Sequence, residues 1–113
     1  MEFKYRIYDE VYNDILSGKK KIEFRLLNYK SNSIQIGDKI TFFVVDDEEK
    51  YLNVEVIDKL FYENLDALWN SKDVLNNTLN YTKEEFIDAF YNIFGKENVI
   101  NSKIVGFKFK ILD

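Results

Sequence analysis

The sequence of 113 residues contains neither cysteine nor histidine. Without cysteine there is no disulfide bond and no thiolate nucleophile, and without both residues there is no zinc site of the usual kind. Serine catalysis with a histidine base is excluded as well. Any catalysis must therefore use a lysine, a carboxylate or a hydroxyl group. A carboxylate site for magnesium or calcium remains open, but no Asp-x-Asp loop has suitable spacing. We expect no metal and no cofactor.

Long apolar runs are also missing from the sequence. No window approaches the roughly 18 uninterrupted apolar residues of a membrane span. The first six residues alternate in polarity, unlike the charged and then apolar regions of a secretory signal. We therefore expect a cytoplasmic protein with no membrane segment. Hydrophobic residues make up 46% of the chain, which predicts one core and one domain over residues 1–113.

Charge is distributed unevenly along the chain. The formal net charge of −4 argues against a nonspecific nucleic-acid binder, because such proteins are usually basic. The segment 19–30 contains five basic residues and one acidic residue, Glu23, so it carries +4. A basic patch on an acidic body suits a small anion or a short strand better than a long duplex. The alternative is that the three lysines at positions 19–21 are simply solvated.

Apolar residues that alternate with polar ones predict five strands. Their approximate ranges are 3–7, 22–26, 40–45, 52–56 and 107–111. A charged hairpin loop is expected at residues 46–50, and a polar loop at residues 28–33. Because the strands are short, aromatic and joined by hairpins, they predict a small, mostly antiparallel β-barrel.

Two or three helices are expected between these strands. Helical spacing begins at Asp9, and Gly18 is placed to end that helix. A short helix is expected after Asn64. The clearest helix start is Thr82, because Thr82 and Glu85 have the spacing of a capping box. Strands and helices in this order predict an α+β fold.

One segment resembles a known family. Residues 18–25, Gly-Lys-Lys-Lys-Ile-Glu-Phe-Arg, resemble the Gly-x-Lys-x-x-Glu-x-Arg signature of ASCH domains, which are similar in fold to PUA domains. The resemblance continues in residues 36–40, which look like the Gly-Asp turn of that family, and in residues 104–107, which are similar to its closing strand. It spans nearly the whole chain, and it implies a single PUA-like barrel with a cleft lined by the polar residues of the signature.

The resemblance also implies a function, because ASCH domains are generally proposed to bind RNA or nucleotides in roles near translation and RNA modification. RNA, a nucleotide or a modified nucleoside is therefore the expected partner. In the cleft, Lys20 is expected to contact an anion, and Glu23 to accept hydrogen bonds from exocyclic amino groups. Arg25 suits phosphate or a base edge. Lys21 and Tyr29 are expected beside them, with Tyr29 stacking on a base.

The spacing of Lys20 and Glu23 raises a geometric question. Residues three apart point to opposite faces of a regular strand, so we expect Lys20 to lie in the turn after Gly18. Glu23 lies between Lys21 and Arg25, and we expect these cations to keep it ionised. The plainer alternatives are an exposed lysine and a surface ion pair between Glu23 and Arg25, which is worth at most about 1 kcal/mol.

An enzyme is the alternative to a binding domain. Some small ASCH members are amidohydrolases that remove the acetyl group from acetylcytidine with a lysine, a threonine and a glutamate, and others are described as ribonucleases. Where the threonine is expected, this chain has Glu23. Where the glutamate is expected, residues 76–81 contain no acid, and Thr78 is the nearest hydroxyl. The sequence favours binding, with a hydrolase that uses Lys20 and Glu23 as the alternative. A protein-interaction domain that has lost its ligand is a third possibility, and the oligomeric state is not indicated.

Overall fold

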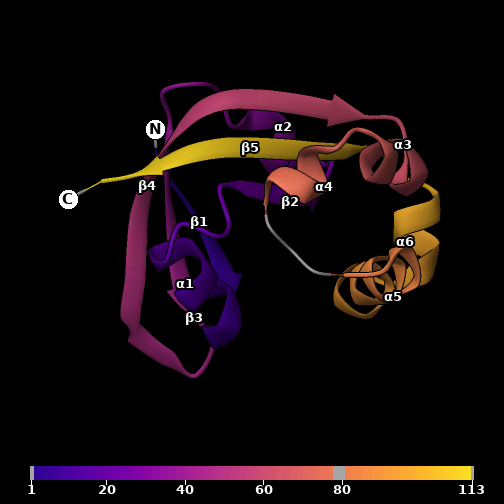
Figure 1. Ribbon diagram of the computed structural model, residues 1–113. Coiled ribbons are helices and arrows are strands. Elements are labelled where there is room, and N and C mark those ends of the chain that lie inside the picture. Colours follow the sequence, from indigo (N-terminus) through magenta and orange to yellow (C-terminus); the bar gives the residue numbers. More distant parts are fainter. Residues whose placement is uncertain (1, 78–80, 113) are drawn as a thin grey trace.

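The computed structural model describes residues 2–77 and 81–112, which form a curled five-stranded sheet with helices around it (Figure 1). The elements in chain order are β1 (Glu2–Ile7), α1 (Asp9–Leu16), β2 (Ile22–Leu26), α2 (Tyr29–Ser33), β3 (Lys39–Val44), β4 (Asp47–Tyr62), α3 (Leu65–Asn70), α4 (Asp73–Asn76), α5 (Lys83–Phe94), α6 (Lys96–Ile100) and β5 (Ile104–Ile111).

The strand order in the sheet is β1-β3-β4-β5-β2. β1 pairs with β3 in parallel, and the other three pairs are antiparallel. The prediction of an α+β fold with a mostly antiparallel sheet is therefore confirmed. The sheet is a half-barrel, in which β1 and β2 are the two edge strands.

The curl of the sheet depends on the long strand β4. Its first part pairs with β3 and its second part with β5, and the register shifts between Val56 and Asp58. An irregularity of this kind adds twist and bends the strand, and Figure 1 shows β4 running along one side of the sheet and then turning over its top. The bend carries β5 and β2 around toward β1.

The buried side chains form two clusters on opposite sides of β2 and β5. The first fills the inside of the half-barrel, where α1 covers it through Ile15, and it includes Tyr5, Phe42, Val54 and Phe107. The second lies under the later helices and includes Phe24, Leu68, Val74, Phe86, Phe90 and Val99. β2 therefore separates the barrel interior from the helical layer.

Several local predictions are confirmed. α1 ends at Leu16, and Gly18 follows with a φ of 81° that suits glycine. The capping box at the start of α5 has both of its hydrogen bonds: the Glu85 amide donates to the Thr82 hydroxyl, and the Thr82 amide donates to the Glu85 carboxylate. A short helix follows Asn64, as expected.

Two predicted loops are wrong. Residues 28–33 contain the short helix α2, because Asn28 caps it and Ser31 completes a capping box. The hairpin loop at 46–50 is tighter than expected, since Asp46 adopts a φ of 68° and β4 begins at Asp47. Two other short helices, α4 and α6, were also not predicted. In the described part of the chain, no helix is both long and apolar enough to span a membrane.

Candidate ligand-binding site

Three side chains of the signature segment form a largely buried charged cluster, which we call the triad: Lys20, Glu23 and Arg25. Lys20 Nζ donates to Oε1 of Glu23 at 2.6 Å. Arg25 Nε and Nη2 both donate to Oε2 of the same carboxylate, at 3.0 and 2.7 Å. The exposed fractions of the three side chains are 13%, 5% and 19%, in that order. Lys20 lies outside β2, after the Gly18 turn, so its predicted position is confirmed.

Glu23 is ionised although it is buried. Burial alone would raise the pKa of its carboxyl group, but the charges of Lys20 and Arg25 and the hydrogen bonds from both side chains hold the pKa below its ordinary value. Lys21 was expected to pair with Glu23, but Lys20 does so instead. The turn before β2 brings the Lys20 side chain back over the strand. Lys21 itself is exposed. Its amide donates to the Asn77 side chain, and its backbone oxygen accepts from the amide of Phe109 in β5.

The face of β2 that carries Glu23 is covered, so the interpretation of a surface ion pair is wrong. Glu23 lies opposite Phe107 in the register with β5, and Phe107 belongs to the inner core. The neighbouring residues Ile22 and Phe24 point to the other side, into the helical cluster. A charged group on this strand therefore lies at the boundary of the barrel interior.

Arg25 joins the two edges of the half-barrel. Its Nη2 also donates to the backbone oxygen of Arg6 in β1 at 3.0 Å. Its guanidinium lies 4.1 Å from the centre of the Tyr5 ring, and Lys30 Nζ lies 4.1 Å from the same ring. Lys30 also donates to the backbone oxygen of Lys4. Burial raises the pKa of Tyr5 to about 12, a shift that the positive charge of Arg25 opposes, so this ring is neutral at physiological pH.

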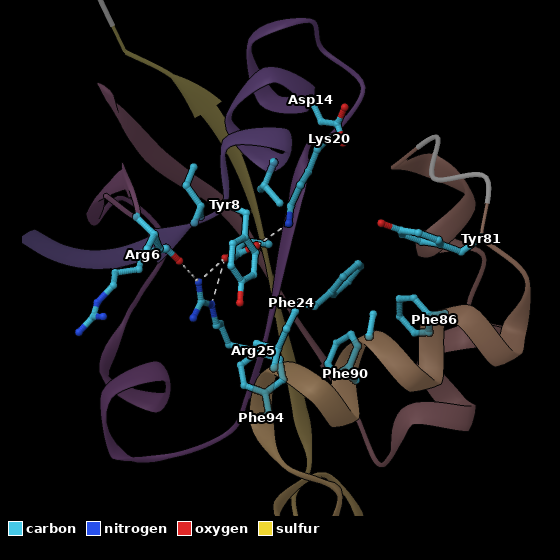
Figure 2. A pocket seen from close by; sticks show the side chains of 16 residues that line it. Arg6, Tyr8, Asp14, Lys20, Phe24, Arg25, Tyr81, Phe86, Phe90 and Phe94 are labelled. Carbon is cyan, nitrogen blue, oxygen red and sulfur yellow. Dashed lines mark hydrogen bonds and ion pairs between the residues drawn. The ribbon is translucent and has the colours of Figure 1, made fainter. Parts of the chain in front are cut away.

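The triad borders a cavity of about 420 Å³ between the β1 and β2 edges and helix α5 (Figure 2). This volume is within the usual range for small-molecule sites. Phe86, Phe90 and Phe94 line the wall that α5 supplies, and Tyr8 and Tyr81 also line the cavity. A polar floor with an opposing aromatic wall can hold a flat ligand that has a polar edge.

Asn77 holds the start of β2 in place, a role that no pattern in the sequence predicts. Its Oδ1 accepts from the amides of Lys21 and Ile22, at 3.0 and 2.9 Å, and its Nδ2 donates to the Ile22 oxygen at 2.8 Å. Asn77 is fully buried. A buried asparagine is not distinguishable by sequence from the exposed ones, and its partners lie more than fifty residues away.

Tyr29 lies outside the cavity, on α2, and is 92% exposed. Its predicted stacking role remains a prediction. Thr78 lies outside the described residues. Among residues 2–77 and 81–112, no group of three or more acidic side chains is arranged to hold a metal ion.

No protein-family model matches the sequence, and no curated protein matches it. Solved structures do match. The crystal structure of ASCH from Zymomonas mobilis is 16% identical with a TM-score of 0.61, and covers 95% of this chain and 65% of that one. The ASCH domain from Lactobacillus crispatus is 19% identical with a TM-score of 0.66, and covers 97% and 79%. The chain has the fold of ASCH domains.

Another solved structure matches over its full length. The solution structure of protein PF0455 from Pyrococcus furiosus is 27% identical, with a TM-score of 0.75, and covers 100% of this chain and 99% of that chain. In this chain, the segment that resembles the ASCH signature supplies the triad.

Proposed function

We propose that this protein binds RNA, a nucleotide or a modified nucleoside in the cavity beside the triad. The observation that carries the proposal is a buried carboxylate paired with two partly buried cations, at the floor of a cavity of about 420 Å³ with an aromatic wall. Keeping these charges buried is costly unless they are paired. Their position on a cavity, and not in a closed core, is what a ligand site would require.

The triad offers both kinds of hydrogen-bonding group. Lys20 has three N–H donors and uses one on Glu23. Within the described part of the chain, no group accepts a hydrogen bond from Nη1 of Arg25. The carboxylate of Glu23 stays ionised and has further lone pairs for an exocyclic amino group. Phe86 and Phe90 provide apolar surface for a base.

The test is binding of uridine monophosphate, cytidine monophosphate and a short RNA by calorimetry to three variants. Lys20→Ala and Arg25→Ala are expected to weaken binding about tenfold or more, because each loses a charge-assisted hydrogen bond. Lys103→Ala is the matched control, since it removes a cation from an ion pair with Glu63 that is elsewhere on the surface. Circular dichroism checks folding. Unchanged binding in both triad variants would contradict the proposal.

The remaining predicted ligand contacts are tested with the same assay. Lys21 and Tyr29 are exposed and lie outside the cavity, so only a ligand longer than a nucleotide would reach them. Tyr29→Ala and Lys21→Ala are expected to weaken binding of the short RNA and to leave binding of the mononucleotides unchanged. Equal RNA affinity in wild type and both variants would remove these two residues from the site.

A hydrolase is the second candidate, because Lys20 and Glu23 are in direct contact at 2.6 Å on the cavity floor. A lysine and a carboxylate can act as an acid–base pair. Against this role, both oxygens of Glu23 already accept from cations. Turnover of acetylcytidine or a labelled RNA that is lost in Glu23→Gln would support the hydrolase. Inactivity over both substrates would leave binding as the function.

A further inference from the structure

Two tyrosines at the cavity differ from the other aromatic residues that line it. Tyr8 is 58% exposed and Tyr81 is 45% exposed, whereas Phe24, Phe86 and Phe90 are buried. Tyr8 follows β1 and caps α1, and Tyr81 immediately precedes the cap of α5. Two distant segments thus each place one half-exposed ring at the same cavity.

Both rings are available to a ligand. Figure 2 shows Tyr8 beside the polar floor, and Tyr81 on the side of α5 with its hydroxyl directed toward the cavity. Neither hydroxyl has a hydrogen-bond partner within residues 2–77 and 81–112. By contrast, the buried Tyr62 donates its hydroxyl to Asp73 at 2.5 Å. A tyrosine that is apolar on its faces and polar at its tip suits the contact with a ring that is itself partly polar.

The carboxylate paired with Lys20 favours an uncharged acceptor over a phosphate at that lysine. A phosphate that bonded to Lys20 would lie close to the carboxylate of Glu23, which is 2.6 Å from Lys20 Nζ. A phosphate and a carboxylate that share one ammonium group repel each other, and this repulsion is strong where water is scarce. Asp14 is a second carboxylate in the lining of the cavity. A ring carbonyl or ring nitrogen accepts the same hydrogen bond from Lys20 without this cost.

We infer that a nucleotide enters this cavity base first, with the polar edge of the base on Lys20, its faces against Tyr8 and Tyr81, and its phosphate outside. The inference rests on the proposed function and names the part of the nucleotide that the site recognises. Tyr8 and Tyr81 would then make the cavity select ligands with flat rings. The triad would select among bases by the hydrogen-bonding groups on the polar edge of the base.

The experiment compares uridine, uridine monophosphate and ribose 5-phosphate by calorimetry against wild type, Tyr8→Ala, Tyr81→Ala and Tyr51→Ala. Tyr51 is the matched control, because it is 55% exposed but lies on β4 away from this cavity. We expect the two uridine compounds to bind with similar affinity and ribose 5-phosphate to bind at least tenfold more weakly. Each cavity variant should weaken uridine binding about 5- to 150-fold, the range for loss of one stacked base.

Changing these tyrosines to phenylalanine separates stacking from hydrogen bonding. Tyr8→Phe and Tyr81→Phe should retain uridine affinity within about threefold, since the ring faces remain. Ribose 5-phosphate that binds as tightly as uridine monophosphate, or uridine binding unaffected by both alanine variants, would overturn the inference. If either result is found but Lys20→Ala still weakens nucleotide binding, the proposed function stands and the base-first inference is wrong. If no nucleotide or RNA binds wild type, both fall.

Discussion

At the scale of single residues, Glu23 depends on two cations for its charge. Its carboxylate is 5% exposed, and Lys20 and Arg25 contact its two oxygens separately. An ionised carboxylate so deeply buried is stable only with such partners. The same pairing orients the ammonium group of Lys20 toward the cavity and the guanidinium group of Arg25 toward β1. Glu23 therefore organises both cations, whichever of them a ligand touches.

Removal of the charge at Glu23 tests this arrangement. Glu23→Gln leaves Lys20 and Arg25 without their counter-charge, and we expect the free energy of unfolding at pH 7 to fall by about 3 kcal/mol. This is the lower end of the range for buried pairs, because the two cations keep some exposure. Urea denaturation measures it. Glu63→Gln, which affects an exposed pair with Lys103, should change stability by about 1 kcal/mol or less.

The pKa of Glu23 also predicts how stability depends on pH. Because that pKa is lower in the folded protein than the ordinary 4.5, the ionised group contributes its full stability above about pH 4.5. This contribution is lost as the pH falls through the folded pKa. Unfolding free energies measured between pH 3 and 7 should therefore decrease more steeply below pH 4.5 in wild type than in Glu23→Gln. Parallel curves would show that Glu23 is not held in this way.

At the scale of elements, β2 is positioned by contacts from two other parts of the chain. Asn77 bonds to both the amide and the carbonyl of Ile22 at the start of the strand. Gly106 of β5 lies opposite Phe24, and a Cβ atom there would be 3.2 Å from Ile22 and from the Phe24 ring. The position of β2 in turn fixes the position of the triad, because Glu23 and Arg25 belong to it.

Asn77→Ala should loosen the start of β2. The substitution leaves two amides and one carbonyl without their partner, and each unsatisfied buried group costs about 1–3 kcal/mol. We expect a loss of at least 2 kcal/mol in urea denaturation, and faster hydrogen exchange at the amides of Lys21 and Ile22. Asn70→Ala is the control, since Asn70 is exposed. Protection of both amides in Asn77→Ala would contradict the role.

Gly106→Ala should displace the side chains of Ile22 and Phe24 on β2. Contacts of 3.2 Å to two side chains require them to move, and overpacking of this kind costs about 1–3 kcal/mol. Because Phe24 also lines the cavity, ligand affinity should decrease along with stability. Thermal unfolding and the nucleotide assay measure the two effects. A variant as stable as wild type would show that the side chains of Ile22 and Phe24 can move without loss of folding free energy.

At the scale of the whole molecule, net charge limits how the protein can bind RNA. The segment 19–30 carries a net charge of +4, whereas the whole chain carries −4. This segment can therefore neutralise about four phosphates of a bound RNA strand at most. With about −0.7 for each phosphate on a single strand, the slope of log K against log salt should be no steeper than about −3. Titration of a short RNA between 50 and 300 mM salt measures it. A steeper slope would require a second basic surface.

Part of this site could be predicted from the sequence. The strand at 22–26 and the turn position of Lys20 followed from polarity and from Gly18. The burial of Glu23 did not, because strand alternation shows which residues share a face but not what covers that face. The cover comes from Phe107 and from β1, which are distant in sequence. Asn77 and Tyr8 were missed as site residues for the same reason, since only the fold brings them to the signature.

The bonds from Arg25 and Lys30 to β1 have a consequence for behaviour at high concentration. They go to the backbone oxygens of Arg6 and Lys4 on an edge strand of the sheet. Unpaired backbone groups on an edge strand are where a strand of another molecule can add, and this addition starts aggregation. With two of its oxygens occupied by cationic side chains, β1 offers a poor template for such growth. Arg25, which borders the cavity, and Lys30, which lies outside it, thereby both shield this edge of the sheet.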